Sequence, residues 1–524
     1  MSDISTDNQI FVIGIGGTGM RCLESMVHFC AAGRFSDKRI HMLALDTDFR
    51  NGNFQRVDEL VNLYHNLKAG KNPLAGTMFG AQIEFYKYSP DYSTDKTKTL
   101  DKMLLHSRHD EIDKDLAKLF FTDNVRSFEL TEGYRAQTHL GSMLMYRAIV
   151  ESAENHTRSE NESLCRFLEK LGDTNGGMKK CFVMGSVFGG TGASSIPVVP
   201  RAFEAAWKQM KDSTKNLDHV CWGASLLTAY FTFNNPSKDE LQSQKVIADA
   251  GNFKINTQVA LAYYSKDPAV RRSYCQFYIL GNPEDPIDFR KEGETKTDVG
   301  GASQKNPAHY LEMYATTAAE KFFSSRVEKS SEPRYFYRVM NMLNSQDGYL
   351  NFSDVVEGNS ESNDFALNLL TLKVLAADSK DDQIFSPDSI RKNAFPKDIA
   401  WLWDSKDLQD YLVMYNAWVK QLWNSANRQN HLFFKQEAFE KKGAEFFKDC
   451  MNDLFLPQLS SASYFKGKSY KKTGVFGKTA WDPFVTQCQK WITDPGLEKN
   501  LPEMSQALRF VSVIRGVLKT MYQF

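Results

Sequence analysis

Three glycines within four residues mark the stretch of this chain best suited to chemistry. The segment CFVMGSVFGGTGASSIPVVPRAFEAAW, Cys181 to Trp207, passes from an apolar run through a glycine-rich loop into a helical pattern. Glycine lets the backbone take positive φ and approach a ligand closely, and the next helix offers free N–H groups at its N-terminus. We therefore expect an anion site, suited to phosphate, made by Gly189, Gly190, Thr191, Gly192 and Ala193.

A second glycine loop lies near the N-terminus, in FVIGIGGTGMRCLESM. A β-branched run from Gln9 to Ile15 precedes it, and the next apolar run, IHMLALDTD, ends in Asp46 and Asp48. This strand-loop-helix-strand pattern fits G-x-G-x-x-G followed by an acid. Taken alone it fits NAD binding, ATP-using adenylyltransferases related to ubiquitin-activating enzymes, or a guanine-nucleotide fold; the glycines would otherwise only permit a tight turn. The candidate ligand-binding residues here are Gly16, Gly17, Thr18, Gly19 and Asp46.

Further polar residues follow other predicted elements. Two glycine-containing turns, Leu67 to Gly76 and Leu130 to Met143, could meet a terminal phosphate, and we favour the second because it contains Arg135. Asn282 and Asn306 each precede a proline and offer an amide either to a nucleobase or to a turn or cap. His309 and Glu312 stand three apart, as a metal pair or as packing residues, with no third ligand in view.

The composition describes a chain that can bury a large core in two or three domains: 524 residues, 42% hydrophobic and 13% aromatic. Lys plus Arg and Asp plus Glu number 64 each, so we expect no nucleic-acid partner. Eight scattered cysteines lack zinc spacing, and no residue is assigned as a metal ligand. The polar N-terminus lacks signal-peptide regions and no apolar run nears about 18 residues, so we expect a cytoplasmic protein without membrane insertion.

Strand and helix patterns alternate along most of the chain, which predicts an α/β fold with a parallel sheet covered on both sides. Residues 51–124 are polar and less periodic, and we expect them to be an insertion of surface loops and helices. A helix should begin with Asn306 near its N-cap and Pro307 at its first position. The apolar run DFALNLLTLKVLAAD predicts a buried strand, and the tryptophan-rich region after Ser379 predicts helices.

These motifs together resemble the tubulin/FtsZ superfamily. FVMGSVFGGTGASSIPVV is similar, without a gap, to the signature phosphate loop of FtsZ-like proteins, although Phe188 replaces its first glycine. FVIGIGGTGM and LALDTD resemble the first FtsZ loop and its NTD segment, and QFYILGNPED and KNPAHYLEMY resemble the segments whose asparagines contact the nucleotide. The resemblance runs in matching order from Gln9 to Asp378, and it identifies a divergent bacterial tubulin-like protein.

The resemblance implies a GTP-binding, GTP-hydrolysing protein with GTP/GDP and Mg²⁺ as cofactors. It implies cytoskeletal filaments made by head-to-tail homopolymerisation, in which a loop of the adjacent subunit completes the site. GYLNFSDVV resembles that loop, which gives Asp354 as the residue that orients water, with Glu357 and Asn351 beside it. The acids stand three and six residues after Asn351, whereas FtsZ places them at two and five.

The implied fold is a Rossmann-like GTPase domain with a central helix over residues 1–327, a second α+β domain over 328–400, and a helical C-terminal region over 401–524 that could bind another protein. A nucleotide-regulated scaffold with little hydrolysis and a dinucleotide- or ATP-using Rossmann enzyme remain as alternatives. We also expect that a bulky residue at Gly190 or Gly192 abolishes nucleotide binding and leaves the protein folded.

Overall fold

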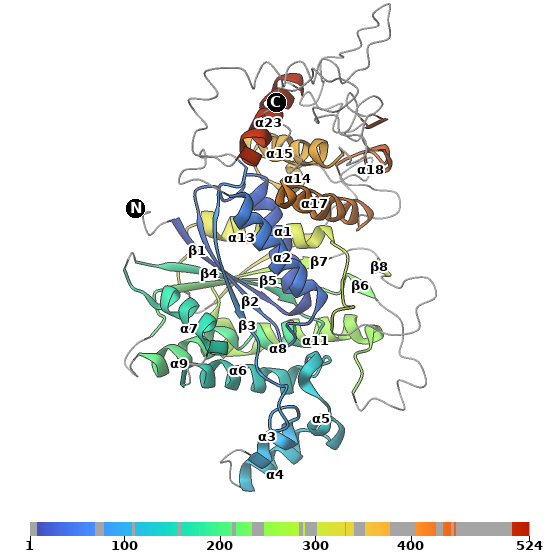
Figure 1. Cartoon of the computed structure of the whole chain (residues 1–524). Coiled ribbons are helices and arrows are strands. Elements are labelled where there is room, and N and C mark those ends of the chain that lie inside the picture. Colours follow the sequence, from blue (N-terminus) through green and yellow to red (C-terminus); the bar gives the residue numbers. More distant parts are fainter. Residues whose placement is uncertain are drawn as a thin grey trace, which may run out of the picture.

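A parallel sheet between two helical layers forms the body of the molecule, seen in the computed structural model (Figure 1). The structure describes residues 8–68, 78–106, 111–154, 159–175, 177–211, 216–232, 246–281, 287–288, 301–330, 332–339, 352–377, 405–425, 433–441, 445–446 and 506–522. In this part of the chain no helix is long and apolar enough to span a membrane.

Seven strands form the main sheet, in the order β3-β2-β1-β4-β5-β7-β9, and every pairing is parallel. The central strands β1, β2, β4 and β5 are apolar and buried on both faces, as expected when helices cover a parallel sheet, whereas the edge strand β9 is largely exposed. The strands are β1 (Gln9–Ile15), β2 (Arg39–Leu45), β3 (Gln82–Tyr88), β4 (Lys179–Ser186), β5 (Val220–Leu227), β7 (Gln276–Gly281) and β9 (Arg334–Val339). A separate parallel pair joins β6 (Phe231–Thr232) to β8 (Ile287–Asp288).

Helices cover the two faces of the sheet, and each face has its own apolar core. One face packs against α1 (Gly16–Ala31), α2 (Gly52–Leu67) and α13 (Tyr310–Ser324). The other packs against α6 (Thr138–Glu154), α7 (Ser159–Gly172), α9 (Val199–Met210), α11 (Phe253–Lys266) and α12 (Pro268–Ser273). These layers lie above and below the sheet in Figure 1. The predicted α/β fold with a covered parallel sheet is confirmed.

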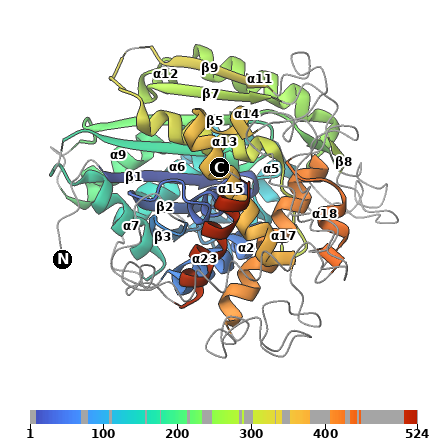
Figure 2. The same ribbon diagram turned by 90° about the horizontal axis from the view of Figure 1, so that it is seen from above.

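An outer helical layer covers α1 and α2 on the side away from the sheet, and Figure 2 shows it from above. His28 of α1 stacks on Trp418 with ring centroids 4.5 Å apart, and the Asn368 amide donates to the Ala32 carbonyl at 2.7 Å. This layer buries α1 almost completely. It contains α14 (Phe352–Val355), α15 (Asn359–Ala377), α17 (Lys406–Ser425), α18 (Glu437–Glu440) and α23 (Gln506–Tyr522).

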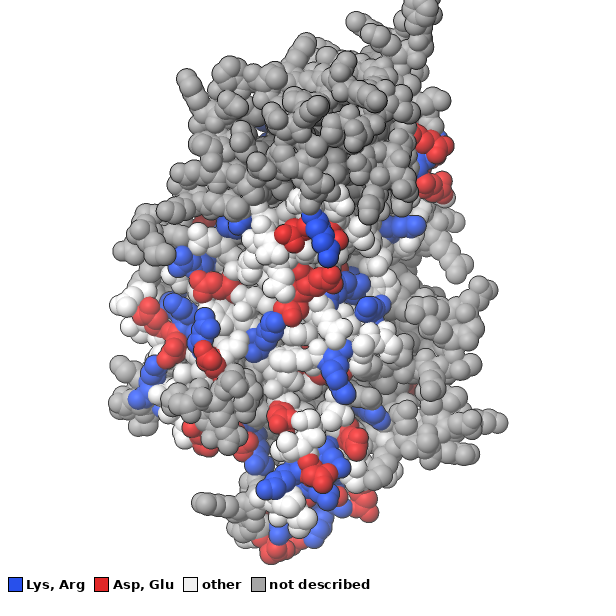
Figure 3. Space-filling model, in the orientation of Figure 1, with Lys and Arg blue, Asp and Glu red and all other residues white. Residues whose placement is uncertain are grey.

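Three short helices project from the opposite side of the molecule, at the bottom of Figure 1. They are α3 (Leu100–His106), α4 (Glu111–Phe120) and α5 (Asp123–Ser127). One-turn 3-10 helices lie at Leu130–Glu132 and Ala250–Asn252, and a five-residue helix, α8, at Thr191–Ser195. On the face shown in Figure 3, acidic and basic side chains intermingle over the projecting helices, so they present no field of a single sign there.

Three expectations about individual elements are wrong. The described part of this run, DFALNLLTLKVLAA, lies in α15; every residue from Phe365 to Leu375 is buried, and a helix buried on all sides lacks the periodicity that would distinguish it from a buried strand. Residues 51–124 are not all surface insertion: α2 packs on α1, and β3 pairs with β2 along its whole length. The GYLNFSDVV segment ends in the short helix α14, with Phe352 and Val355 buried.

Residues 328–400 were expected to begin a second α+β domain, but their first strand belongs to the main sheet. β9 lies within residues 328–400, yet it pairs with β7 and extends the main sheet. The described segments after Val339 are helices, and residues 340–351 and 378–400 lie outside the described part. The domain boundaries therefore stay predictions.

Candidate functional site

The order of the strands places a crevice at the carboxyl ends of β1 and β4. From β1 the chain moves outward to β2 and β3, then returns to add β4 on the other side of β1. Ligands of open parallel sheets bind outside the carboxyl ends of the strands at such a switch point. The first glycine loop follows β1 directly, and the second follows β4.

The two glycine loops touch each other. Gly16 has φ +67°, and a Cβ built on it would lie 3.2 Å from the Thr191 Cβ and 3.4 Å from the Gly192 backbone nitrogen. Gly19 also has no room for a side chain, because a Cβ there would lie 2.8 Å from the Met184 carbonyl oxygen of β4. Two loops that are 170 residues apart in sequence thus form one backbone surface.

The N-terminus of α1 points into this surface with free donors. Ile15 precedes the helix and makes no side-chain cap, and the first turn contains no acid. The first N–H groups of a helix have no intrahelical partner, and the helix dipole makes that end favourable for an anion. A 16-residue helix that begins in glycines at a switch point is therefore well suited to bind phosphate.

A turn before α6 closes one side of the second glycine loop. A Cβ on Gly190 would lie 2.8 Å from the Ala136 nitrogen, and Gly133, with φ +88°, faces Thr47 and Thr191. The Thr47 and Thr191 hydroxyl oxygens are 3.3 Å apart. Arg135 stands in this turn with φ +45°, and its guanidinium donates to the Val246 carbonyl at 2.9 Å. The Arg135 backbone therefore lies against the second glycine loop, whereas the Arg135 side chain binds the segment before α11.

We expected that a bulky residue at Gly190 or Gly192 would leave the protein folded, but the backbone contacts at both positions contradict this. A Cβ on Gly192 would lie 2.6 Å from the Ser186 carbonyl oxygen, and a Cβ on Gly190 meets the backbone of the 133–136 turn. Gly189 differs, because its Cβ would meet only the Ser186 hydroxyl oxygen, at 3.4 Å. Gly189 is consequently the position that tests ligand binding without a clash.

Asp46 directly follows β2 beside the crevice, and only one of its two carboxylate oxygens accepts a hydrogen bond from the described residues. One carboxylate oxygen accepts from the Thr47 backbone N–H at 2.7 Å, and the other is buried without a hydrogen-bond partner among the described residues. Burial raises the pKa of Asp46 to about 7, and the nearby Asp48 adds to the rise. Asp48 is occupied differently, because its carboxylate accepts from the Gly301 N–H at 2.7 Å. A buried orphan acceptor indicates a place for a donor that the protein does not supply.

The segment that contains Asn306 lies against the start of α2. Asn53 is fully buried, and its side-chain oxygen Oδ1 accepts from the Asn306 backbone N–H at 2.9 Å and from the Arg56 guanidinium at 2.9 Å. Arg56 also donates to the Asn306 carbonyl at 2.7 Å. Asn53 was not among the residues predicted from the sequence, because residues 51–124 were expected to be a surface insertion. The available signal was the pattern Asn51-Gly52-Asn53 directly after the acidic end of β2.

Beneath these contacts, a buried charge network joins α1, α2 and α13. Arg21 pairs with Glu24 and lies 3.7 Å from Glu312, while Arg56 lies 3.2 Å from Glu24. Glu312 also accepts from the Tyr230 hydroxyl at 3.0 Å. Breaking one partner of such a pair leaves a buried charge uncompensated. The network therefore fixes how the glycine-loop helix sits against α13.

His309 and Glu312 form a helix cap, and the helix α13 begins at Tyr310, not at Pro307 as predicted. The His309 Nδ1 accepts from the Leu311 N–H at 3.2 Å, and Glu312 accepts from the His309 N–H at 3.0 Å. This reciprocal capping explains the later start, since it satisfies two donors of the first turn. The described residues contain no group of three or more His, Cys, Asp or Glu side chains that could hold a metal ion.

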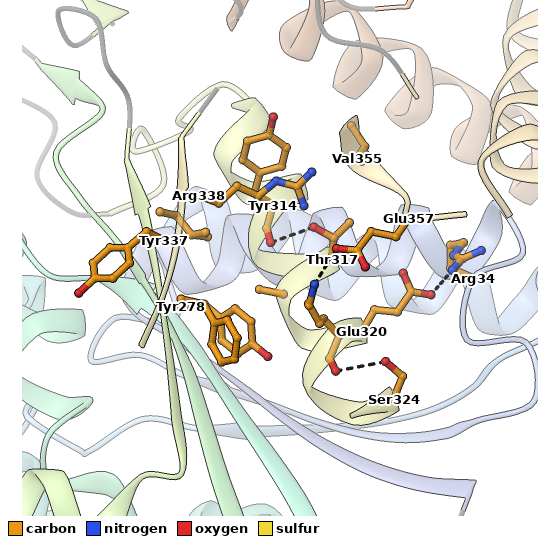
Figure 4. A pocket seen from close by; sticks show the side chains of 14 residues that line it. Arg34, Tyr278, Tyr314, Thr317, Glu320, Ser324, Tyr337, Arg338, Val355 and Glu357 are labelled. Carbon is orange, nitrogen blue, oxygen red and sulfur yellow. Dashed lines mark hydrogen bonds and ion pairs between the residues drawn. The ribbon is translucent and has the colours of Figure 1, made fainter. Parts of the chain in front are cut away.

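The candidate catalytic residues lie at the other end of α13. Glu357 forms an ion pair with Lys321 at 2.7 Å, and both line a cavity of about 440 Å³ between α13, β7, β9 and α14 (Figure 4). Eleven residues at 1.5 Å each place Lys321 about 16 Å along the helix from Tyr310. The Asp354 backbone lies in α14; its side chain, Asn351 and Asn282 lie outside the described part.

No family model and no curated protein matches this chain. Among solved structures it is similar to CetZ from Methanosaeta thermophila strain DSM 6194, with 14% identity, a TM-score of 0.23, and coverage of 52% of this chain and 45% of that one. It is also similar to Clostridium botulinum phage c-st TubZ with a truncated C-terminal tail, with 12% identity, a TM-score of 0.21, and coverage of 52% and 53%.

Each match spans about half the length of the other protein. Both proteins belong to the tubulin/FtsZ superfamily, which is the family that the sequence motifs resemble. Identities and TM-scores this low carry no argument about function. The function rests instead on the geometry of the two glycine loops.

Proposed function

We propose that this chain is a tubulin/FtsZ-like protein that binds and hydrolyses GTP and assembles head to tail into filaments. One observation carries the proposal: two glycine loops, each at a strand end and a helix start, touch at the switch point of a parallel sheet. Backbone N–H groups from two such loops can surround a di- or triphosphate without a lysine. A dinucleotide enzyme would need only the first loop and would leave the second without a role.

The binding residues follow from this arrangement. Phosphates would lie on the first glycine loop (Gly16, Gly17, Thr18, Gly19) and on the second (Gly189, Gly190, Thr191, Gly192, Ala193). Asp46 fits a ribose hydroxyl or a water bound to Mg²⁺, because its unpaired oxygen is the hard ligand type that Mg²⁺ prefers beside substrate phosphates. Arg135 would act through the backbone of its turn, since Val246 holds its guanidinium.

The choice of GTP over ATP rests on the family resemblance and on Asn306. Its backbone is held from both sides by Asn53 and Arg56, which leaves its side-chain amide to offer a donor and an acceptor to a guanine edge. Asn282 is proposed for the same role from the end of β7. A site built for these hydrogen bonds rejects a base that cannot make them.

Hydrolysis is proposed to need a second subunit. Glu357 pairs with Lys321, about 16 Å along α13 from Tyr310, which follows the Asn306 segment. Within one chain it is therefore remote from the phosphates. Asp354, Glu357 and Asn351 would instead serve the nucleotide of the next subunit, where a carboxylate orients the attacking water. A head-to-tail contact of this kind does not close and generates a filament.

Two measurements test the proposal. A thermal-shift series with GTP, GDP, ATP and NAD should show stabilisation by guanine nucleotides, with ATP and NAD weaker; equal or stronger stabilisation by ATP would reject the assignment. Phosphate release from GTP, measured from dilute to concentrated protein, should rise per molecule because one chain holds only part of the site. Asp354→Ala should keep GTP affinity, lose most turnover and give longer-lived filaments by electron microscopy.

Constant activity per molecule that survives Asp354→Ala would refute completion of the site in trans. Nucleotide binding with filaments but without phosphate release would assign the chain to a regulated scaffold. Partner binding by the C-terminal helices and a cytoplasmic location belong to the same proposal, on the basis of the family resemblance.

A further inference from the structure

We propose that Asn53 binds the nucleotide directly and positions its base reader at the same time. Its side-chain N–H donates to a phosphate oxygen at the start of α1, and its carbonyl oxygen holds the segment that carries Asn306. This inference rests on the proposed function and adds to it a residue that links phosphate recognition to base recognition.

The side-chain amide nitrogen of Asn53 is a buried donor without a partner among the described residues. Asn53 has no exposed surface, and its Nδ2 makes no hydrogen bond within the described part of the chain. A Cβ built on Gly17 would lie 3.3 Å from this nitrogen, so the amide faces the first turn of α1. An unpaired buried donor destabilises the folded chain, and a bound acceptor would remove that cost.

The position favours a phosphate as that acceptor. Gly17 belongs to the uncapped N-terminus of α1, where the free backbone N–H groups and the helix dipole already favour an anion. Arg56 donates to the Asn53 carbonyl oxygen and polarises the same amide. The Asn53 side-chain N–H group would therefore add an amide donor to the backbone N–H groups and threonine hydroxyls of this site.

The acceptor half fixes the base reader. The Asn53 carbonyl oxygen accepts the Asn306 N–H at 2.9 Å, and the Asn53 backbone N–H donates to Asn51 at 2.8 Å. Asn51 in turn donates to Gln304, in the same segment as Asn306. Loss of the Asn53 side chain would therefore release both a phosphate contact and the support of Asn306.

Two substitutions separate these functions. Asn53→Asp keeps an acceptor for Asn306 and Arg56, removes the donor, and turns a negative charge toward the phosphate. Asn53→Ala removes both. Asn368→Asp is the matched control, because Asn368 is also a buried amide beside an arginine, Arg515, but lies on α15 away from the glycine loops.

Affinities for GTP, ATP and inorganic pyrophosphate should be measured by calorimetry on the full chain, with thermal melts to verify folding. We expect Asn53→Asp to weaken GTP and pyrophosphate at least about tenfold and to preserve the GTP-to-ATP ratio. Asn53→Ala should weaken GTP and also reduce that ratio. Asn368→Asp should change the melting temperature only.

The outcomes are distinct. If the wild-type chain binds no nucleotide, the proposed function itself fails. If it binds GTP and Asn53→Asp binds equally well, the donor assignment is overturned. Weakened GTP with unchanged pyrophosphate would move the contact away from the phosphate and also overturn it. An unchanged GTP-to-ATP ratio in a folded Asn53→Ala variant would reject the link to Asn306. If Asn53→Asp fails to fold, Asn53→Ala with pyrophosphate decides the phosphate contact.

Discussion

Acidification should destabilise this protein through His309, the cap of α13. The imidazole is fully buried, and its Nδ1 must stay unprotonated to accept the Leu311 N–H. Burial lowers the pKa of His309 from 6.5 to about 3. Glu312 accepts from the His309 backbone N–H, and the rings of Tyr230 and Tyr310 lie with their centroids 4.6 and 4.4 Å from the imidazole. Protonation would therefore bury a charge and turn an N–H toward another N–H.

The direction follows from proton linkage. The unfolded chain binds a proton at His309 below pH 6.5, whereas the folded chain resists protonation down to about pH 3. The stabilising contribution is thus fully present above pH 6.5 and is lost as the pH falls toward 3. The difference between 6.5 and about 3, at roughly 1.36 kcal/mol per pH unit, sets a limit of about 5 kcal/mol. Between pH 8 and pH 5 the loss is about 2 kcal/mol.

Urea unfolding at pH 8, 6 and 5 measures this loss when the wild type is compared with His309→Asn. Asparagine keeps a side-chain acceptor at the N-cap and cannot gain a proton in this range. The variant loses ring packing at every pH, so the informative quantity is how the free-energy difference changes with pH. That difference should shrink by about 2 kcal/mol from pH 8 to pH 5. His106→Asn, at an exposed histidine of α3, is the control. A constant difference between wild type and His309→Asn would refute the reasoning.

Three further predictions concern the loops, the base reader and the outer helices. Gly189→Val should fold normally and lose most GTP affinity, whereas Gly192→Val should lower the melting temperature as well, because only the second places a Cβ 2.6 Å from backbone; equal GTP affinity in Gly189→Val would remove this loop from the site. Asn306→Ala should cost GTP about 1–3 kcal/mol of binding free energy and leave ATP unchanged in calorimetry, and parallel losses would contradict base recognition. Trp418→Ala should lower the free energy of unfolding in urea by about 3–5 kcal/mol, because the side chain is only 1% exposed. Val413→Ala on the same helix is the control, since Val413 is 70% exposed and its loss should lower that free energy by less than about 0.5 kcal/mol. Similar losses for the two variants would show that α17 does not anchor the core.

The glycine loops and the sheet could be predicted because their signals are local. A β-branched run followed by glycines and a helical pattern specifies a strand, a turn and a helix start within about ten residues, and alternation of such units implies a parallel sheet. The contact between Gly16 and Thr191 then follows from strand order, which the family resemblance supplied.

Other features depend on contacts that no local pattern reveals. α15 is buried around its whole circumference from Phe365 to Leu375, so its sequence lacks the helical periodicity of a half-exposed helix. The α13 start depends on whether Asn306 or His309 caps the helix, and Asn306 is already held by Asn53 and Arg56 from another helix. Asn53 itself looks like an ordinary turn residue until the fold buries it.

The burial of α1 between the sheet and the outer layer has a consequence for synthesis on the ribosome. The first glycine loop begins α1, yet the residues that cover its outer face, such as Phe365 and Trp418, emerge more than 300 residues later. Until they arrive, the nascent chain exposes the apolar side of this helix. If the chain binds nucleotide as proposed, the first glycine loop would therefore gain its folded support only after residues as late as Trp418 have been made. Under the same proposal, this order of synthesis would separate the appearance of the loop from the appearance of assembly-competent subunits.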